Sequence, residues 1–186
     1  EDPIEYQLEG VTQIQVHPRI GLTFASALRS VLRQDPDVIF VGEIRDPETA
    51  QIAVRAALTG HLVIATVHTN DASTAVARLL DMEIEPYLIA SSLRGVLGQR
   101  LVRNLCRNCL TPARVKPERL REVGFTDEEG AMLMRGIGCA HCFGTGYRGR
   151  SAIAELMIPD AELQDLITAR RPAAEIRRAA IARGFQ

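Results

Sequence analysis

Four cysteines stand in two C-x-x-C pairs, and they carry the most specific chemistry in this chain. The first pair is Cys106 and Cys109, and the second is Cys139 and Cys142. Each pair can offer two thiolates from one tight turn, and two such turns build a tetrahedral four-sulfur site that suits Zn2+. Glycines flank the second pair and give its backbone the freedom that such a turn needs. We therefore expect a structural zinc site that closes a small subdomain.

Two other uses of these cysteines stay open. They could form two disulfides in a secreted protein, or they could serve redox chemistry, as C-x-x-C pairs often do. Two pairs around a long loop fit a metal better than either alternative. The metal interpretation also places the protein in the cytoplasm, where thiols stay reduced.

Polar side chains follow two short apolar runs of the sequence. The run 38–41 reads as a strand buried on both faces and leads directly to Glu43, and the run 62–67 leads to His68. Because ligands bind beyond the carboxyl ends of parallel strands, both side chains are site candidates. Each also has a plainer interpretation, since Glu43 could be a solvated loop acid and His68 could make a structural hydrogen bond.

Two further acids open the chain, at Glu1 and Asp2, where they would follow whatever strand precedes them. Carboxylates at such an edge can hold Mg2+ through water or polarise an attacking water. A short strand that ends in an acid resembles the Walker B element of nucleotide hydrolases. The usual Asp before the Glu is Gly42 here, so that generic match is incomplete.

Two arginines and one more histidine are weaker candidates. Arg29 and Arg33 lie one helical turn apart, where they could clamp phosphates or simply form a solvated face. His61 precedes its strand, so a structural hydrogen bond is at least as good an interpretation as catalysis. No match to G-x-x-x-x-G-K-S/T, the loop that cradles nucleotide phosphates, occurs in the sequence.

The elements that must position these residues alternate between strands and helices, which predicts β-α-β units and a mostly parallel sheet. Capping residues before apolar periods mark several helix starts. The pattern predicts strands at 11–17, 38–41, 62–67 and 151–157, helices at 23–33, 46–58, 71–82 and 86–103, a short helix after Thr126, and helices opened by Asp160 and Pro172.

Composition limits the function classes. The 186 residues are 46% hydrophobic and 24% charged, and the formal net charge is −1, so no global basic field points to directly bound nucleic acid. No apolar run approaches the roughly 20 residues of a membrane-spanning helix. The chain begins without an initiator Met and stops just past a predicted helix, and we expect it to be a piece of a longer protein.

Several long motifs in order resemble one family over essentially the whole chain: the C-terminal ATPase domain of type II secretion and type IV pilus assembly motors. The stretch 1–6 is similar to the Asp box of that family, 21–53 to its Walker B region, which also has Gly before Glu, and 59–72 to its His box. The stretches 98–109 and 138–150 resemble the two halves of its tetracysteine zinc module.

This resemblance implies a fold class and a division of the chain. The fold would be α/β, a partial RecA-like P-loop NTPase core at 1–103 with a tetracysteine zinc subdomain at 104–150. A C-terminal strand and helices would follow at 151–186. The phosphate loop would lie upstream of Glu1 and the family continues past Gln186, so this polypeptide alone is expected not to hydrolyse ATP.

The resemblance also assigns roles residue by residue. Glu43 would be the catalytic glutamate that orients or activates water, and His68 would contact the γ-phosphate region. Glu1 and Asp2 would support Mg2+ and that water. Arg29 and Arg33 gain weight as charge-stabilising groups, in their own subunit or across subunits, and His61 keeps a weaker assignment. ATP with Mg2+ would be the nucleotide of the parent protein.

The implied machine is a homohexamer, peripheral on the cytoplasmic face of the inner membrane through platform proteins. It would drive pseudopilus assembly and protein export by a type II secretion system. The related retraction motors typically lack the cysteine module, which favours secretion or assembly. The alternatives are a type IV pilus extension motor, a DNA-uptake motor, and a non-catalytic zinc scaffold if the upstream phosphate loop is absent.

Overall fold

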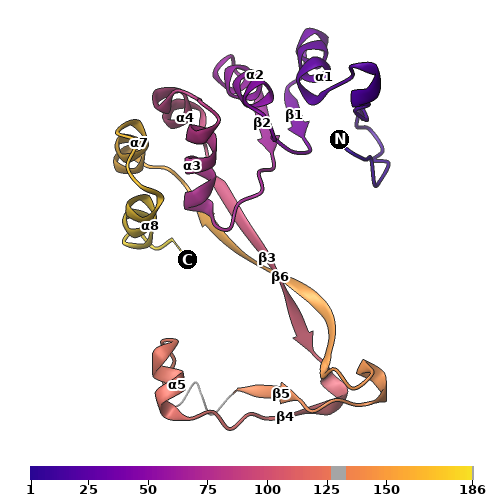
Figure 1. Cartoon of the computed structure of the whole chain (residues 1–186), viewed down its shortest axis with the longest axis vertical. Coiled ribbons are helices and arrows are strands. Elements are labelled where there is room, and N and C mark those ends of the chain that lie inside the picture. Colours follow the sequence, from indigo (N-terminus) through magenta and orange to yellow (C-terminus); the bar gives the residue numbers. More distant parts are fainter. Residues whose placement is uncertain (127–132, 186) are drawn as a thin grey trace. The chain divides into compact units, whose positions relative to one another are not determined.

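The computed structural model describes residues 1–126 and 133–185 (Figure 1). Contacts between Cα atoms divide the chain into two compact units: unit 1 is Glu1–Gly98 with Glu155–Gln186, and unit 2 is Gln99–Ala154. The expected division at 1–103, 104–150 and 151–186 stays a prediction. The short helix expected after Thr126 falls outside the described residues.

The sheet of unit 1 pairs β1 (Val38–Val41) with β2 (Leu62–Ala65) in parallel, with Val38 opposite Leu62. The connection is α2 (Pro47–Leu58), so the three elements form the predicted β-α-β unit. Ile39 and Val41 of β1 are 4% exposed, because alternate side chains of a strand point to opposite faces. The expected strand 62–67 ends two residues early, where Thr66 turns back to bond the loop after β1.

Capping side chains begin the helices of unit 1 where the sequence predicts them. In each case the side chain of the residue before the helix accepts a hydrogen bond from a backbone N–H of the first turn, which would otherwise have no partner. These helices and their caps are α1 (Phe24–Val31) after Thr23, α2 after Asp46, α3 (Ala72–Asp81) after Asp71, and α7 (Ala161–Thr168) after Asp160.

One predicted helix is wrong over much of its length. The helix that opens at Pro86 was expected to reach about Arg103, yet α4 ends at Ser92. The backbone is extended from Leu93, and Val96–Leu105 is a strand, β3, which pairs with β6 (Tyr147–Met157). Gly95 and Gly98 weaken a helix here, and a partner strand far along the chain supplies the hydrogen bonds instead.

The strand predicted at 11–17 is also wrong. The segment 11–17 does not pair with the sheet. Val16 instead donates its N–H to the carbonyl of Glu1 at 3.0 Å, and His17 forms an isolated bridge with Leu22. The two glutamines of the pattern turn back on the N-terminal loop, where their Oε1 atoms accept from Ile4 and Leu8. A 3-10 turn, η1 (Pro18–Ile20), follows.

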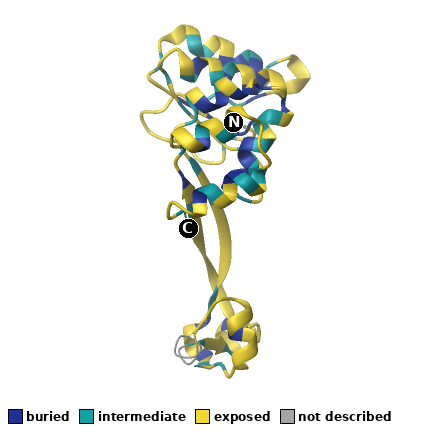
Figure 2. Ribbon diagram, turned by 90° about the vertical axis from the view of Figure 1, so that its left-hand side faces the viewer, coloured by how far each residue is buried: buried dark blue, intermediate teal, exposed yellow. Residues whose placement is uncertain are grey.

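The core of unit 1 is apolar and continuous. Figure 2 shows the buried segments gathered on the inward faces of its helices. Burying each large aliphatic side chain contributes about 1.5–3 kcal/mol, so burial of these side chains stabilises the packing of the helices. The largest fully buried side chains of this core are Ile84, Ile89, Met157, Ile167, Ile176 and Val76, contributed in part by α8 (Ala173–Ile181).

Unit 2 has little apolar core. Two 3-10 turns, η3 (Arg107–Cys109) and η4 (Ala140–Cys142), carry the cysteines, and β4 (Leu110–Pro112) pairs antiparallel with β5 (Met134–Gly136). A short helix that the sequence did not predict, α5, spans Pro117–Glu122. Among the described residues of this unit, the buried apolar side chains are Cys106, Cys109, Cys142 and Leu120.

Across the described part of the chain, no helix has both the length and the apolar character that crossing a bilayer requires.

Candidate functional site

The four cysteine sulfurs form one cluster in unit 2. All four Sγ atoms lie within 4.8 Å of one another. The Cys106–Cys139 and Cys109–Cys142 separations are each 3.9 Å, and the Cys139–Cys142 separation is 3.7 Å. Four sulfurs at about 2.3 Å from a tetrahedral Zn2+ would lie about 3.8 Å apart. The residues present therefore fit a four-sulfur metal site, and no disulfide joins them.

Two glycines let the halves of this cluster meet. A Cβ atom on Gly136 would lie 2.1 Å from the carbonyl oxygen of Gly146, and one on Gly146 would lie 2.4 Å from that of Gly136. The Gly146 carbonyl in turn accepts from the N–H of Cys106 at 2.9 Å. The close backbone approach that brings the two knuckles together thus excludes any side chain at either glycine.

The backbone around Cys142 favours the thiolate, which is the form that binds a metal. Burial raises the pKa of the Cys142 thiol, but the N–H groups of Cys139 and Gly146, each 3.2 Å from its sulfur, together with the thiols of Cys139 and Cys109, outweigh burial and bring the pKa to about 6. Burial raises the pKa of Cys109 to about 11. His141, between the second pair, is exposed and is not among the clustered residues.

A second constellation forms in unit 1 at the carboxyl edge of the parallel strands. Glu43, directly after β1, has a side chain only 11% exposed and makes an ion pair with Arg45. The Nε2 atom of His68, after β2, lies 3.3 Å from Glu43 Oε2. The two strand ends that the sequence singled out are therefore brought together.

Thr66 ties the two loops of this edge to each other. Its carbonyl accepts from the N–H of Ile44 at 2.9 Å, its own N–H donates to the Val41 carbonyl at 3.4 Å, and its hydroxyl donates to the Gly42 carbonyl. These bonds continue the strand pairing past the end of the sheet. The loop that carries Glu43 is therefore held against the segment that leads to His68.

Glu1 and Asp2 also reach this edge. Asp2 lies 3.7 Å from Arg45, and Glu1 passes so close that a Cβ atom on Gly42 would lie 3.4 Å from its Cα. That distance is an ordinary contact, so Glu1 runs alongside Gly42 without excluding a side chain there.

The charge balance of this edge keeps Glu43 ionised. The Arg45 guanidinium, which forms an ion pair with Glu43, lowers the pKa of that carboxyl, and the nearby His68 adds to this effect, while burial opposes it. Glu43 in turn raises the pKa of Arg45. An ionised, nearly buried carboxylate beside an imidazole can orient or deprotonate a water molecule.

The remaining candidates lie elsewhere in unit 1, and their roles stay predictions. Arg29 pairs with Glu48 of α2, and Arg33 lies in the 3-10 turn η2 (Leu32–Gln34) after α1. The Nδ1 atom of His61 lies 3.0 Å from the Ala56 carbonyl, so this ring contacts the end of α2 near the amino end of β2.

Arg45 is a residue of this edge that was not predicted from the sequence, although it lies within the Walker B-like stretch 21–53. Arg45 contacts both Glu43 and Asp2, and it is the largest cause of the lowered pKa of Glu43. The available signal was its position two residues after Glu43, because alternate side chains of extended backbone share a side.

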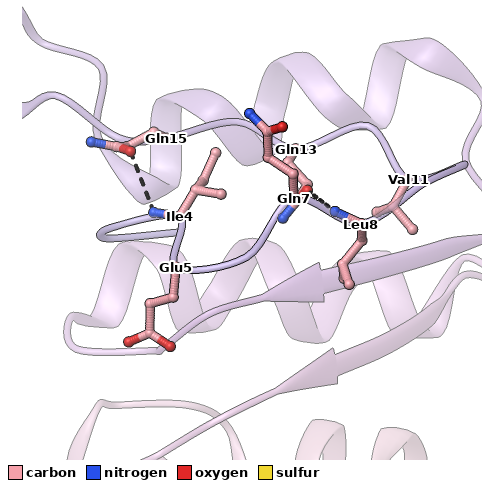
Figure 3. Close-up of a pocket in the computed structure, with 7 residues that line it drawn as sticks. All are labelled: Ile4, Glu5, Gln7, Leu8, Val11, Gln13 and Gln15. Carbon is pink, nitrogen blue, oxygen red and sulfur yellow. Dashed lines mark hydrogen bonds between the residues drawn. The ribbon is translucent and has the colours of Figure 1, made fainter.

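An open hollow lies in the N-terminal loop (Figure 3). It has a volume of about 660 Å³ and a lining of glutamine and aliphatic side chains, with one acid. None of the candidate residues lines it. The lining residues are Ile4, Glu5, Gln7, Leu8, Val11, Gln13 and Gln15.

Comparisons with known sequences agree on one family. A family model described as "Type II/IV secretion system protein" matches residues 1–185. The chain is 54% identical over its whole length to the type IV pilus assembly ATPase PilB of Thermus thermophilus and to the type II secretion system protein HxcR of Pseudomonas aeruginosa. It is 56% identical over 90% of its length to the type II secretion system ATPase E of Vibrio cholerae. The chain spans 21%, 36% and 33% of these three relatives, respectively.

Solved structures agree on the fold. The pilus retraction motor PilT with bound ADP matches 96% of the chain with a TM-score of 0.63 and 29% identity, and the chain covers 42% of it. The Legionella pneumophila ATPase DotB matches 99% of the chain with a TM-score of 0.61 and 25% identity, again with 42% of it covered. The predicted fold class is confirmed: part of an α/β, RecA-like P-loop NTPase core, with a tetracysteine subdomain and C-terminal helices.

Proposed function

The chain belongs to the type II/IV secretion system protein family, and from this premise we propose that it is part of a hexameric ATPase. Its hydrolysis of ATP drives pseudopilus assembly and protein export by a type II secretion system. The observation that carries the proposal is the Glu43 constellation, in which an ionised carboxylate contacts Arg45 and lies 3.3 Å from His68 at the carboxyl edge of parallel strands.

Each residue of this edge has a part in the proposed reaction. Glu43 accepts a hydrogen bond from the attacking water and draws its proton away, and Arg45 keeps that carboxylate ionised. His68 is exposed enough to reach the γ-phosphate region. Glu1 and Asp2 would hold Mg2+, which supplies charge neutralisation for the phosphates when it is bound with ATP.

Zn2+ is the metal proposed for the cysteine cluster, with Cys106, Cys109, Cys139 and Cys142 as its ligands. Four thiolates at the observed sulfur separations suit a closed, structural site. The part of the metal is to hold unit 2 together, because few other side chains are buried among the described residues of that unit.

The assembly and location follow from the family as proposals. The parent protein forms a homohexamer that works with inner-membrane platform proteins on the cytoplasmic face, and it binds no nucleic acid directly. Arg29, Arg33 and His61 contribute to the nucleotide site within or between subunits. Residues 1–186 alone are inactive, because the phosphate-loop sequence is not among them.

A second assignment has specific support. The identity to the pilus assembly ATPase PilB, 54% over the whole chain, equals that to the secretion protein HxcR. A type IV pilus extension motor, or a DNA-uptake motor of the same kind, would use the same site with a different client. Restoring secretion or pilus extension in a deletion strain distinguishes these clients.

The test of the ATPase is Glu43→Gln in the full-length protein that contains this chain. We expect ATP binding, measured by calorimetry, to stay within about twofold, because the amide keeps the shape of the carboxylate. Turnover should fall by about 100-fold or more, since the proton acceptor is lost.

Glu9→Gln is the matched control, because it neutralises an exposed glutamate of the N-terminal loop. Near-normal turnover in Glu43→Gln would remove Glu43 from its role. A full-length protein that binds no ATP at all would instead support the non-catalytic zinc scaffold.

A further inference from the structure

The segment that carries His68 is held at both ends, and Glu155 holds the end farther from the sheet. Oε1 of Glu155, on β6, accepts the backbone N–H of Ala72 at 2.6 Å, across a sequence separation of 83 residues. We propose that Glu155 is a positioning residue that sets where His68 lies relative to Glu43. The proposal rests on the proposed function, because it concerns the same site.

The near end of the segment is fixed by Thr66, which bonds to the loop after β1 through its carbonyl, its N–H and its hydroxyl. Between Thr66 and Ala72, the side chain of His68 is 88% exposed. An exposed ring has few packing contacts to hold it, so its position depends on where the backbone is anchored. Anchors on both sides of His68 are therefore what can keep its Nε2 within reach of Glu43.

The far end is the first turn of α3. Asp71 caps the Thr74 N–H at 2.8 Å and lies 3.5 Å from Arg177 of α8. Burial raises the pKa of Asp71, but the hydrogen bonds from the Ser73 hydroxyl and from Thr74, together with Arg177, lower it below its usual value. The cap leaves the Ala72 N–H without a helical partner, and Ala72 is 0% exposed, so water does not reach that residue. Glu155 supplies the missing acceptor.

Gly98 makes room for this contact. Glu155 lies against β3, and a Cβ atom on Gly98 would come 2.7 Å from Oε1 and 2.8 Å from Cγ of Glu155. Any side chain at position 98 therefore has to displace the carboxylate that bonds Ala72. By contrast, a Cβ atom on Gly95 would meet its nearest neighbours at 3.7 Å and 3.8 Å, which are ordinary contacts.

Gly98 and Glu155 also lie at the boundary between the two units of the chain. Gly98 is the last residue of unit 1 before the cysteine unit, and Glu155 is the first residue after it. The two strands that connect the units covalently, β3 and β6, thus supply Gly98 and Glu155, the glycine that makes room and the acceptor that bonds Ala72. The sequence alone predicts no role for Gly98 or for Glu155.

The experiment uses the full-length protein with four variants: Glu155→Ala, Glu155→Gln, Gly98→Ala and the double variant Gly98→Ala/Glu155→Ala. Gly95→Ala is the matched control. We measure kcat and KM for ATP, ADP affinity by calorimetry, and amide hydrogen exchange in residues 66–74. Exchange in residues 47–58 of α2 checks that the fold is intact.

We expect Glu155→Ala and Gly98→Ala each to lower kcat about tenfold, with ADP affinity within about twofold, because positioning acts on the reacting geometry. Both should speed exchange in 66–74 and leave 47–58 unchanged. Glu155→Gln keeps an acceptor oxygen and should rescue most of kcat. The double variant should be no slower than Glu155→Ala alone, since the clash at position 98 needs the glutamate.

Three results would overturn the proposal: additive losses in the double variant, no rescue by Glu155→Gln, or unchanged exchange in 66–74. Failure of the proposed function has a different signature. Wild-type protein without ATP turnover would remove the catalytic part of the proposal, while exchange in 66–74 would still decide whether Glu155 anchors this segment.

Discussion

The cysteine cluster of unit 2 and the Glu43 edge of unit 1 are built in opposite ways. The four sulfurs come from two short turns, and they are most of what that unit buries among its described residues. The Glu43 edge combines Asp2, Arg45 and His68, which come from separate segments and have mostly exposed side chains. These segments are supported by the large apolar core of unit 1. In the first case the ligands make the structure, and in the second a finished structure positions the residues.

This contrast has a consequence for mutations. Loss of a metal ligand should unfold its surroundings, because little else holds them. Loss of a residue at the Glu43 edge should change chemistry and leave the fold alone, because the core beneath it does not depend on that residue.

The largest expected effect is that of Cys139→Ser. The variant should lose its zinc and the ordered structure of unit 2, because apparent zinc-binding free energies of about 10–16 kcal/mol are coupled to folding in such sites. Zinc content and limited proteolysis within 99–154 measure this, and unit 1 should stay resistant. The control is His141→Ala, at an exposed position between Cys139 and Cys142, and this variant should keep its metal. A Cys139→Ser protein with normal protease resistance would show that the cysteine ligands do not hold unit 2 together.

Next in size is Arg45→Gln, which should change the chemistry of the Glu43 edge without unfolding it. Loss of the guanidinium removes the main cause of the lowered Glu43 pKa, so this pKa should rise. The acid limb of kcat/KM against pH should then move to higher pH in the full-length protein. The stability that ionised Glu43 contributes above its unfolded pKa should also be lost at a higher pH as the solution is acidified.

Arg55→Gln, which changes an exposed arginine of α2, is the control for Arg45→Gln. An acid limb that does not move would show that Arg45 does not set the ionisation of Glu43.

A smaller effect is expected from Asp46→Ala, which tests a local feature of unit 1. Asp46 caps α2 by accepting from the N–H and the hydroxyl of Thr49, each at 2.8 Å, and Thr49 is fully buried. Its loss should reduce the free energy of unfolding of unit 1 by about 1–2 kcal/mol. Urea unfolding measures this, and Asp46→Asn should recover much of the loss. An unchanged midpoint would mean that water replaces the cap.

The smallest effect on stability is expected at the Arg29–Glu48 pair. Both side chains are more than half exposed, so either Arg29→Gln or Glu48→Gln should change the free energy of unfolding by less than about 1 kcal/mol. The two should differ in turnover if Arg29 acts on the nucleotide: only Arg29→Gln should lower kcat in the assembled protein. Equal turnover in the two variants would show that Arg29 only forms the surface ion pair with Glu48.

Local chemistry explains which elements the sequence predicts well. Asp46, Asp71 and Asp160 each begin a helix because their side chains accept from an N–H three residues ahead, which requires no distant partner. The expected strand 11–17 and the expected helix 86–103 are wrong for the converse reason. Val16 bonds to Glu1, and β3 pairs with β6, so distant partners decide both segments.

The sequence by itself predicts the cysteine site, because the spacing within each C-x-x-C pair places two thiols on one turn, while the meeting of the two pairs is a contact across 33 residues. It also determines that Glu43 and His68 end neighbouring strands. Only the tertiary structure decides that Asp2 reaches Arg45 and that Glu155 bonds Ala72. The physical reason is sequence separation: turns and caps form from adjacent residues, whereas contacts such as that of Glu155 with Ala72 exist only after the core has packed.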